Sequence, residues 1–171
     1  MIDPPPNFLQ PSANDAGGAP DDVRERLRAD HDAVLAALDH LRREKDPARC
    51  GQRLRELRTA WVVHALAEET VVYRVLEGAT DPAARADERF IEHEVVGHLF
   101  EKLAAARPGT LEWNARLNVI RDLIARHIES EHGQLFPQLE RQFDEGQLRE
   151  LGERFRLARD KLLLLERAKA A

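Results

Sequence analysis

The sequence predicts an all-α protein, an up-down-up-down four-helix bundle with an additional C-terminal helix. Three observations predict this fold. Apolar residues recur at steps of three and four along most of the chain, and no stretch alternates with the two-residue period of a β-strand. Proline and glycine clusters divide the chain at short turns, as in a bundle. The segment HALAEETVVY, from His64 to Tyr73, returns later in the chain as HIESEHGQLF, from His127 to Phe136, which indicates a repeated helical hairpin.

The composition narrows the class of protein. A chain of 171 residues, 43% hydrophobic and 33% charged, is typical of one soluble globular domain. The net charge of −5 and the lack of a basic stripe predict no nucleic-acid partner. No apolar run is long enough for a membrane helix, and no signal peptide is visible. The single cysteine, Cys50, cannot form an internal disulfide, so we expect a cytoplasmic protein in which this thiol is inert.

The chain divides into three predicted parts. Residues 1–20 are rich in proline, glycine and small polar residues, so we expect a flexible tail. The alternative is a tail that packs along the bundle through Phe8 and Leu9. Residues 21–143 should form the four-helix bundle and residues 144–171 an accessory helix.

The first predicted helix begins at Asp21 or Asp22, because acidic residues favour a first turn, and it ends before Pro47. The second covers residues 48–77. One face of each helix is apolar except for His31 in the first helix and two polar residues in the second. The inward positions are Val23, Leu27, His31, Val34, Leu38 and Leu41, then Leu54, Leu57, Trp61, His64, Glu68, Val71 or Val72, and Val75 or Leu76.

The third helix is predicted over residues 82–106, the fourth over 111–143 and the last over 145–169. Pro137 lies inside the fourth pattern, so we expect a kink there. The last helix contains no histidine, which favours an accessory role. The inward positions of the third and fourth helices are Phe90, His93, Val96 or Gly97, Phe100 and Leu103, then Leu117, Ile120, Ile124, His127, Glu131 and Leu135.

Two glutamates are predicted to lie in the core. His64 and Glu68 are separated by one helical turn, so they point the same way to within about 40°, on the apolar face of their helix. His127 and Glu131 repeat this arrangement. A buried carboxylate without a partner costs several kcal/mol, and no lysine or arginine lies on these two stripes. A bound cation resolves the conflict, because imidazole nitrogens and carboxylate oxygens are good metal ligands.

The number of candidate ligands indicates two metal ions. The acid–histidine sequences Asp30-His31 and Glu92-His93 recur with nearly the same spacing as the longer repeat and add two histidines to the set. Six ligands exceed the four that a structural zinc ion takes, whereas two carboxylates from symmetric helices can each bridge a pair of ions. The predicted ligands are His31, His64, Glu68, His93, His127 and Glu131.

These motifs together resemble the hemerythrin-like family, also called the HHE cation-binding domain family. The resemblance covers about residues 22–165 and is carried by DH at position 30, HALAEETVVY, EH at position 92 and HIESEHGQLFP. It implies a cofactor of two non-haem iron ions joined by an oxo or hydroxo bridge. It also implies four terminal histidines and two bridging glutamates among the predicted ligands.

One departure from the family concerns a fifth histidine. Oxygen-carrying hemerythrins have a histidine one turn after the histidine of the third helix, but here Gly97 follows His93 at that distance. His98 lies roughly 140° around the helix from His93. We consider His98 a candidate fifth ligand, or a residue that supports a ligand, and the alternative is a polar residue at a helix interface. Gly97 could leave space for a small ligand or allow close helix packing.

Three further residues are weaker candidates. Tyr73 matches Phe136 in the repeat, so its ring should lie in the core, and its hydroxyl could reach the metal pocket as an additional ligand or support. Glu69 and His132 each follow a predicted bridging glutamate. They should lie at the surface or support a ligand.

The sequence thus predicts a di-iron protein that binds oxygen or another small oxidant for sensing, storage or delivery. Its partner would be a small diatomic molecule or peroxide. Three alternatives remain: an enzyme acting on peroxide or nitric oxide, an iron donor for iron–sulfur cluster repair, and a helical interaction module whose histidine–glutamate pairs are incidental. The preference for iron over manganese or zinc comes from the resemblance alone.

Overall fold

The computed structural model describes residues 22–76 and 83–170. The predicted N-terminal tail, residues 1–20, lies outside the described residues. Within the described ranges almost every residue is helical and none forms a strand, which confirms the all-α prediction.

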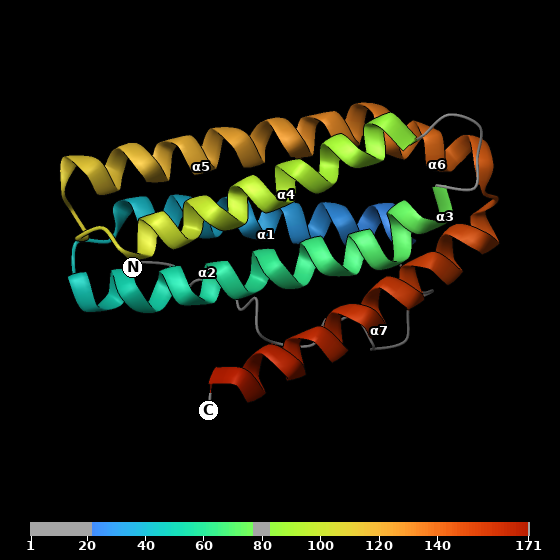
Figure 1. Cartoon of the computed structure of the whole chain (residues 1–171). Helices are drawn as coiled ribbons and strands as arrows, with labels where there is room; N and C mark the ends of the chain where they lie inside the picture. Colours follow the sequence, from blue (N-terminus) through green and yellow to red (C-terminus); the bar gives the residue numbers. More distant parts are fainter. Residues whose placement is uncertain (1–21, 77–82, 171) are drawn as a thin grey trace.

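Four long helices surround a common interior. α1 (Val23–Arg43) contacts α2 (Pro47–Glu68) and α5 (Leu111–Ser130), and α4 (Ala83–Ala104) contacts α2 and α5 in turn. Figure 1 shows these helices side by side, with α7 (Glu145–Ala170) crossing outside them. α7 packs against α1 and α2, so it covers one side of the bundle.

Two of the long helices contain a wider turn at nearly the same place in the repeat, displaced by one residue. α2 continues as the π-helical turn η1 (Glu69–Tyr73) and then α3 (Arg74–Leu76). α5 continues as the π-helical turn η2 (Glu131–Leu135) and then α6 (Phe136–Gln142), with the Phe136 N–H bonded to the Glu131 carbonyl. The predicted single helices over 48–77 and 111–143 therefore each contain one turn with an extra residue.

Pro137 lies in the first turn of α6, directly after η2. At the place of the predicted kink, the structure has a π-helical turn. The matching position in the first repeat is Arg74, and η1 forms there without a proline. The proline is therefore compatible with the wide turn but is not what requires it.

The helix starts follow the capping residues. The Asp22 side chain accepts hydrogen bonds from backbone N–H groups of Arg24 and Glu25, and the Glu25 side chain accepts from the Asp22 N–H, which completes a capping box. Asp46 caps α2, whose first residue is a proline, and Thr110 caps α5. The sequence left Asp21 and Asp22 as alternative starts of the first helix, and in the structure Asp22 is the residue that caps it.

The buried apolar residues form two clusters along the bundle. One contains Leu38, Leu57, Phe100, Leu117 and Ile124, among others, and the other contains Leu27, Val72, Leu139, Leu151 and Phe155, among others. Val72, Leu76 and Val96 are the buried members of the alternatives that the sequence left open. A layer of buried histidine and glutamate residues lies between the two clusters. The predicted inward positions have the same order along each helix, with the polar residues between apolar ones.

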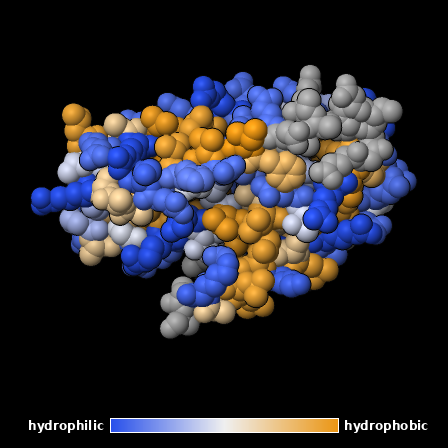
Figure 2. All heavy atoms as spheres, viewed as in Figure 1, coloured by the Kyte–Doolittle hydropathy of each residue, from blue (hydrophilic) through white to orange (hydrophobic). Residues whose placement is uncertain are grey.

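The surface carries some exposed apolar side chains. Figure 2 shows them over the α4–α5 face, where Ile91, Val95 and Val119 are exposed, and beside α7, where Leu164 and Leu165 are exposed. Among the described helices, none combines the length and the apolar character needed to cross a membrane.

Candidate metal centre

The six predicted ligands all lie in the interior of the bundle. None of them is more than 4% exposed, although all are polar. They come from every long helix of the bundle: His31 from α1, His64 and Glu68 from α2, His93 from α4, His127 from α5, and Glu131 from the first residue of η2. The repeat in the sequence therefore becomes one polar layer in space.

The four imidazoles form two pairs. His31 and His64, the first pair, have ring centroids 4.9 Å apart. His93 and His127, the second pair, have their Nε2 atoms 3.1 Å apart. Each pair thus joins one histidine from an acid–histidine sequence with one histidine from an HxxxE sequence.

The two carboxylates lie between the histidine pairs. Glu68 Oε2 is 3.6 Å from Nε2 of His64 in the first pair and 3.6 Å from Nε2 of His93 in the second. Glu131 also reaches one imidazole of each pair, with carboxylate oxygen to Nε2 distances of 3.1 Å and 3.4 Å. Both glutamates therefore have the position that a bridging ligand needs.

The donor atoms in this layer fit a bound metal. Nε2 of His64 and Glu68 Oε1 are buried and make no hydrogen bond, which is costly unless another partner is present. His31 Nε2 and Glu131 Oε2 lie 3.1 Å apart but make no hydrogen bond of good geometry, and Nδ1 of His64 is too far from Asp30, at 3.6 Å, to form one. Two sets of residues each offer ligand atoms within 4.8 Å of one another. These sets are His64, Glu68, His93 and His127, and His31, His64 and Glu131. Nitrogen and carboxylate oxygen donors of this kind suit iron, manganese or zinc.

The electrostatics of the two glutamates are opposite. Burial and the neighbouring Glu131 carboxylate raise the pKa of Glu68 well above its ordinary value of 4.5. Burial would also raise the pKa of Glu131, but the imidazoles of His127 and His31 outweigh it and hold this pKa well below 4.5. The protein alone thus favours one proton on the carboxylate pair, and cations between the carboxylates would take the place of that proton.

Tyr73 is the third oxygen donor in the centre. Its hydroxyl lies 2.7 Å from Glu131 Oε1 and 3.0 Å from Glu68 Oε2, and its ring stacks on His93 with centroids 5.8 Å apart. In an α-helix, residues five apart point about 140° away from each other. The π-helical turn η1 adds one residue to the turn, so Tyr73 shares the inward face of Glu68.

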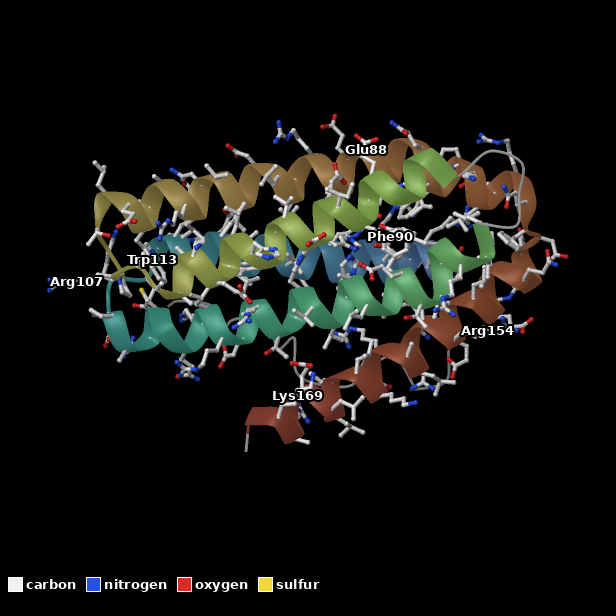
Figure 3. All side chains as sticks on the ribbon, viewed as in Figure 1. Glu88, Phe90, Arg107, Trp113, Arg154 and Lys169 are labelled. Atoms are coloured by element: carbon white, nitrogen blue, oxygen red, sulfur yellow. The ribbon has the colours of Figure 1, made fainter. Side chains whose placement is uncertain are left out.

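Arg89, Phe90 and Trp61 enclose the centre. The Arg89 guanidinium is buried and lies 5.8 Å from the centre of the Tyr73 ring. Its charge acts on Glu68 and lowers the pKa of that carboxyl in part, although no cation lies on the stripes of α2 and α5. Arg89 precedes His93 by one helical turn, and that spacing could have identified it. Phe90, labelled in Figure 3, meets the tyrosine ring edge-on at 5.3 Å between centroids. The Trp61 ring contacts three of the four histidines.

The acids of the two acid–histidine sequences support the other two histidines. Glu92 Oε2 lies 2.8 Å from Nδ1 of His127, and Asp30 Oδ2 lies 3.6 Å from Nδ1 of His64. Burial would raise the pKa of Asp30, but the contact with His64 and the charge of Arg159 hold it below the ordinary value of 3.8. Carboxylates behind a histidine fix the orientation of the ring and strengthen it as a ligand.

Glu69 and His132 support the remaining histidines. Glu69 Oε1 lies 2.8 Å from Nδ1 of His93, and Nε2 of His132 lies 3.1 Å from Nδ1 of His31. Of the two sequence-based expectations for these residues, surface position or support of a ligand, the structure favours support. Each hairpin thus supplies partners for the histidines of both pairs, a relationship that spacing along one helix could not reveal.

The structure does not bring His98 to the centre. Its side chain is exposed, and its Nδ1 lies 3.0 Å from the Glu94 carbonyl of its own helix. His98 therefore makes no contact that would support a role as fifth ligand or as support of a ligand. At five residues after His93, its side chain points away from the interior of the bundle. A Cβ on Gly97 would meet no atom within 4 Å, so close packing is not what the glycine provides.

The sequence predicts that the Cys50 thiol is inert. Burial raises the pKa of this thiol, which favours its less reactive protonated form.

Two surface grooves approach the second histidine pair. One, of about 740 Å³, lies between α4 and α5 and is lined by Glu92, Val95 and Leu123, among others. The other, of about 430 Å³, is lined by Glu69, Arg74 and Phe90, among others. Each groove is therefore lined in part by a carboxylate that is bonded to a histidine of the second pair.

Comparison with known proteins agrees with this geometry. A curated relative, a DNA nickase from Nostoc sp., is 24% identical over 143 residues. The match covers 82% of this chain and 40% of the relative, so the chain spans less than half of that protein's length. No solved structure matches the chain significantly. The family model of the hemerythrin HHE cation-binding domain matches residues 22–139, and the chain therefore belongs to the hemerythrin HHE cation-binding domain family.

Proposed function

We propose that the protein is a non-haem di-iron protein that binds oxygen or another small oxidant for sensing, storage or delivery. The observation that carries the proposal is the buried layer of four imidazoles and two carboxylates, several of whose donor atoms make no hydrogen bond. In this protein, α1, α2, α4 and α5, with their extensions, would form an up-down-up-down bundle that holds the centre, and α7 would be a helix added to it.

The proposed ligands fall into two groups. The first iron would be held by the first histidine pair and the second by the second pair, with Glu68 and Glu131 shared between them. Tyr73 would add its oxygen on the side of the second pair, because its ring stacks on His93. Two irons supply reversible one-electron chemistry next to a small ligand, and the protein supplies a buried site that excludes water.

A second candidate function is an enzyme acting on peroxide, and Tyr73 is the observation that favours it. Its hydroxyl lies within hydrogen-bonding distance of both carboxylates, so it can hold a proton beside the place where a small oxidant would bind. DNA nicking is not proposed for this chain, since the match covers 40% of the Nostoc protein and this chain has a net charge of −5.

Metal analysis of the purified chain tests the proposal. After anaerobic loading with ferrous iron and removal of the excess, we expect two irons per chain. Glu68→Ala and Glu131→Ala should lose most of this iron, because a shared ligand is removed from both positions. Glu129→Ala, which changes an exposed glutamate two residues before Glu131, should retain it. Normal iron content in both buried variants would contradict the bridging assignment.

Hydrogen peroxide separates the two candidate functions. A binding protein should take up oxygen reversibly and leave added peroxide unchanged. A peroxide enzyme should convert two molecules of hydrogen peroxide into two of water and one of oxygen, over many turnovers per centre, and oxygen release measures this directly.

A further inference from the structure

α7 reaches the metal centre although it contains no predicted ligand. Arg159 Nε donates to Asp30 Oδ2 at 3.0 Å, and the same carboxylate oxygen lies 3.6 Å from Nδ1 of His64. The Phe155 ring, one turn earlier in α7, lies 6.3 Å from the His64 ring between centroids. The helix that the sequence indicates as accessory therefore contacts one histidine directly and the carboxylate behind it.

The other half of the duplicated site differs at this point. Glu92 is the counterpart of Asp30 and accepts from Nδ1 of His127 at 2.8 Å. Its side chain is 39% exposed and lines the groove between α4 and α5, whereas the Asp30 side chain is 16% exposed. Among the described residues, Glu92 forms no ion pair with an arginine or lysine. The repeat thus gives both halves a carboxylate, and α7 gives only one half an arginine on that carboxylate.

An arginine changes what the carboxylate does to the imidazole. A carboxylate beside the Nδ1–H group of a histidine stabilises positive charge on the ring and makes the other ring nitrogen a stronger electron donor to a metal. Asp30, 3.6 Å from Nδ1 of His64, is beyond hydrogen-bond distance and acts on this ring through its charge. A charge-assisted bond from a guanidinium takes up part of the carboxylate charge. In a buried site the effect is large, because the local dielectric constant is low. His64 should therefore donate less strongly than His127.

We propose that Arg159 is a positioning residue that acts through Asp30 on His64 and makes the two metal positions unequal. The position held by His31 and His64 is then the more easily reduced of the two. The inference rests on the proposed di-iron function. It assigns α7 a role in setting the electronic properties of the centre in addition to covering it.

Redox titration of the full, iron-loaded chain tests this role, with the mixed-valence state followed by electron paramagnetic resonance. In Arg159→Gln, one of the two one-electron midpoint potentials should shift downward, because the released carboxylate charge favours the ferric state. In Asp30→Asn, the same potential should shift upward. The affinity for iron should fall roughly 10- to 100-fold, as is usual when a residue that orients a metal ligand is replaced. Arg159→Lys, which keeps the charge, should stay close to the parent protein.

Arg154→Gln is the matched control. Arg154, labelled in Figure 3, lies on the same helix and pairs with Glu150 on the exposed side, so its loss should leave both potentials unchanged. Opposite shifts in Arg159→Gln and Asp30→Asn cannot come from simple loosening of the site, which would move both in one direction. Equal potentials in Arg159→Gln and Arg154→Gln, or shifts of the same sign in the two site variants, would overturn the inference while leaving two irons per chain intact. Failure of the di-iron function itself would be visible as low iron content in the parent protein.

Discussion

The Tyr73 hydroxyl donates to Glu131 across the bundle, with 2.7 Å between the oxygens, and it can do so because η1 is π-helical. The counterpart of Tyr73 in the second repeat is Phe136, which packs its ring on His132 at 4.7 Å between centroids. The duplicated site is therefore symmetric in its histidines and glutamates and asymmetric at this position, where only one half has a hydroxyl.

Replacing Tyr73 with phenylalanine tests its place in the centre. Tyr73 is the only tyrosine in the chain, so a phenolate-to-iron absorption band in the visible spectrum of the ferric protein can only come from this residue. We expect Tyr73→Phe to keep two irons and to lose that band, because phenylalanine restores the shape of the ring without the oxygen. In the metal-free state, the variant should lose about 1.5–3 kcal/mol of stability, as expected for a hydrogen bond to a charged group. A ferric parent protein without the band would show that Tyr73 supports the carboxylates and does not bind iron.

His93 and His98 provide a matched comparison of a buried and an exposed histidine on α4. His93→Ala should lower the iron content, since it removes an imidazole from the second pair and leaves Glu69 without its bond. His98→Ala should retain the iron content of the parent protein, because this side chain bonds to its own helix. Iron analysis of both variants under identical loading checks this, and a loss in His98→Ala equal to that in His93→Ala would contradict the placement of His98.

The stability of the metal-free protein should depend on pH through Glu68. Its pKa in the folded protein is raised above 4.5 by burial and by Glu131, so the folded state holds a proton that the unfolded chain has already released. The stabilisation is complete below 4.5 and is lost as the pH rises through the folded pKa, with a slope of up to about 1.4 kcal/mol per pH unit.

Denaturant unfolding with a chelator present measures this effect. The useful quantity is the difference in unfolding free energy between the parent protein and Glu68→Gln, in which the titration of the buried histidines cancels. We expect this difference to fall as the pH increases, because glutamine holds no titrating proton. Parallel curves for the two proteins at all pH values would show that Glu68 does not carry the proton.

α7 should contribute strongly to stability through one face. Phe155 is buried against the centre, whereas Leu157 is 54% exposed on the same helix. Phe155→Ala should lower the free energy of unfolding by about 3–5 kcal/mol, as for other buried aromatic side chains. Leu157→Ala should change it by no more than about 0.5 kcal/mol. Equal effects in chemical denaturation would indicate that α7 does not pack as described.

The sequence was most informative where all the residues of a histidine–glutamate pattern lie on the same helix. The spacing of His64 and Glu68, and its repetition at His127 and Glu131, predicted both the buried face and the residues on it, because side chains one turn apart in a helix share a direction. It was least informative where helices meet. The bond from Glu69 to His93 joins the extension of α2 to α4, and Arg159 reaches Asp30 from a distant part of the chain.

The π-helical turns show the same limit within one helix. The match to Phe136 in the repeat placed the Tyr73 ring in the core. A regular α-helix would turn Tyr73 away from Glu68, so the reach of its hydroxyl stayed open. The extra residue in the turn costs backbone regularity and is stabilised by burial of the side chains on either side of it, which only the packed bundle supplies.

By itself, the sequence determined that this protein is helical, that its two hairpins repeat, and that imidazoles and carboxylates occupy its interior, because helical periodicity converts spacing into direction. Tertiary structure alone decided which histidine each outer carboxylate supports, that Tyr73 joins the centre, and that α7 covers one half of it. The physical reason is that these contacts depend on the relative position of different helices, which packing of the apolar clusters fixes and local spacing does not.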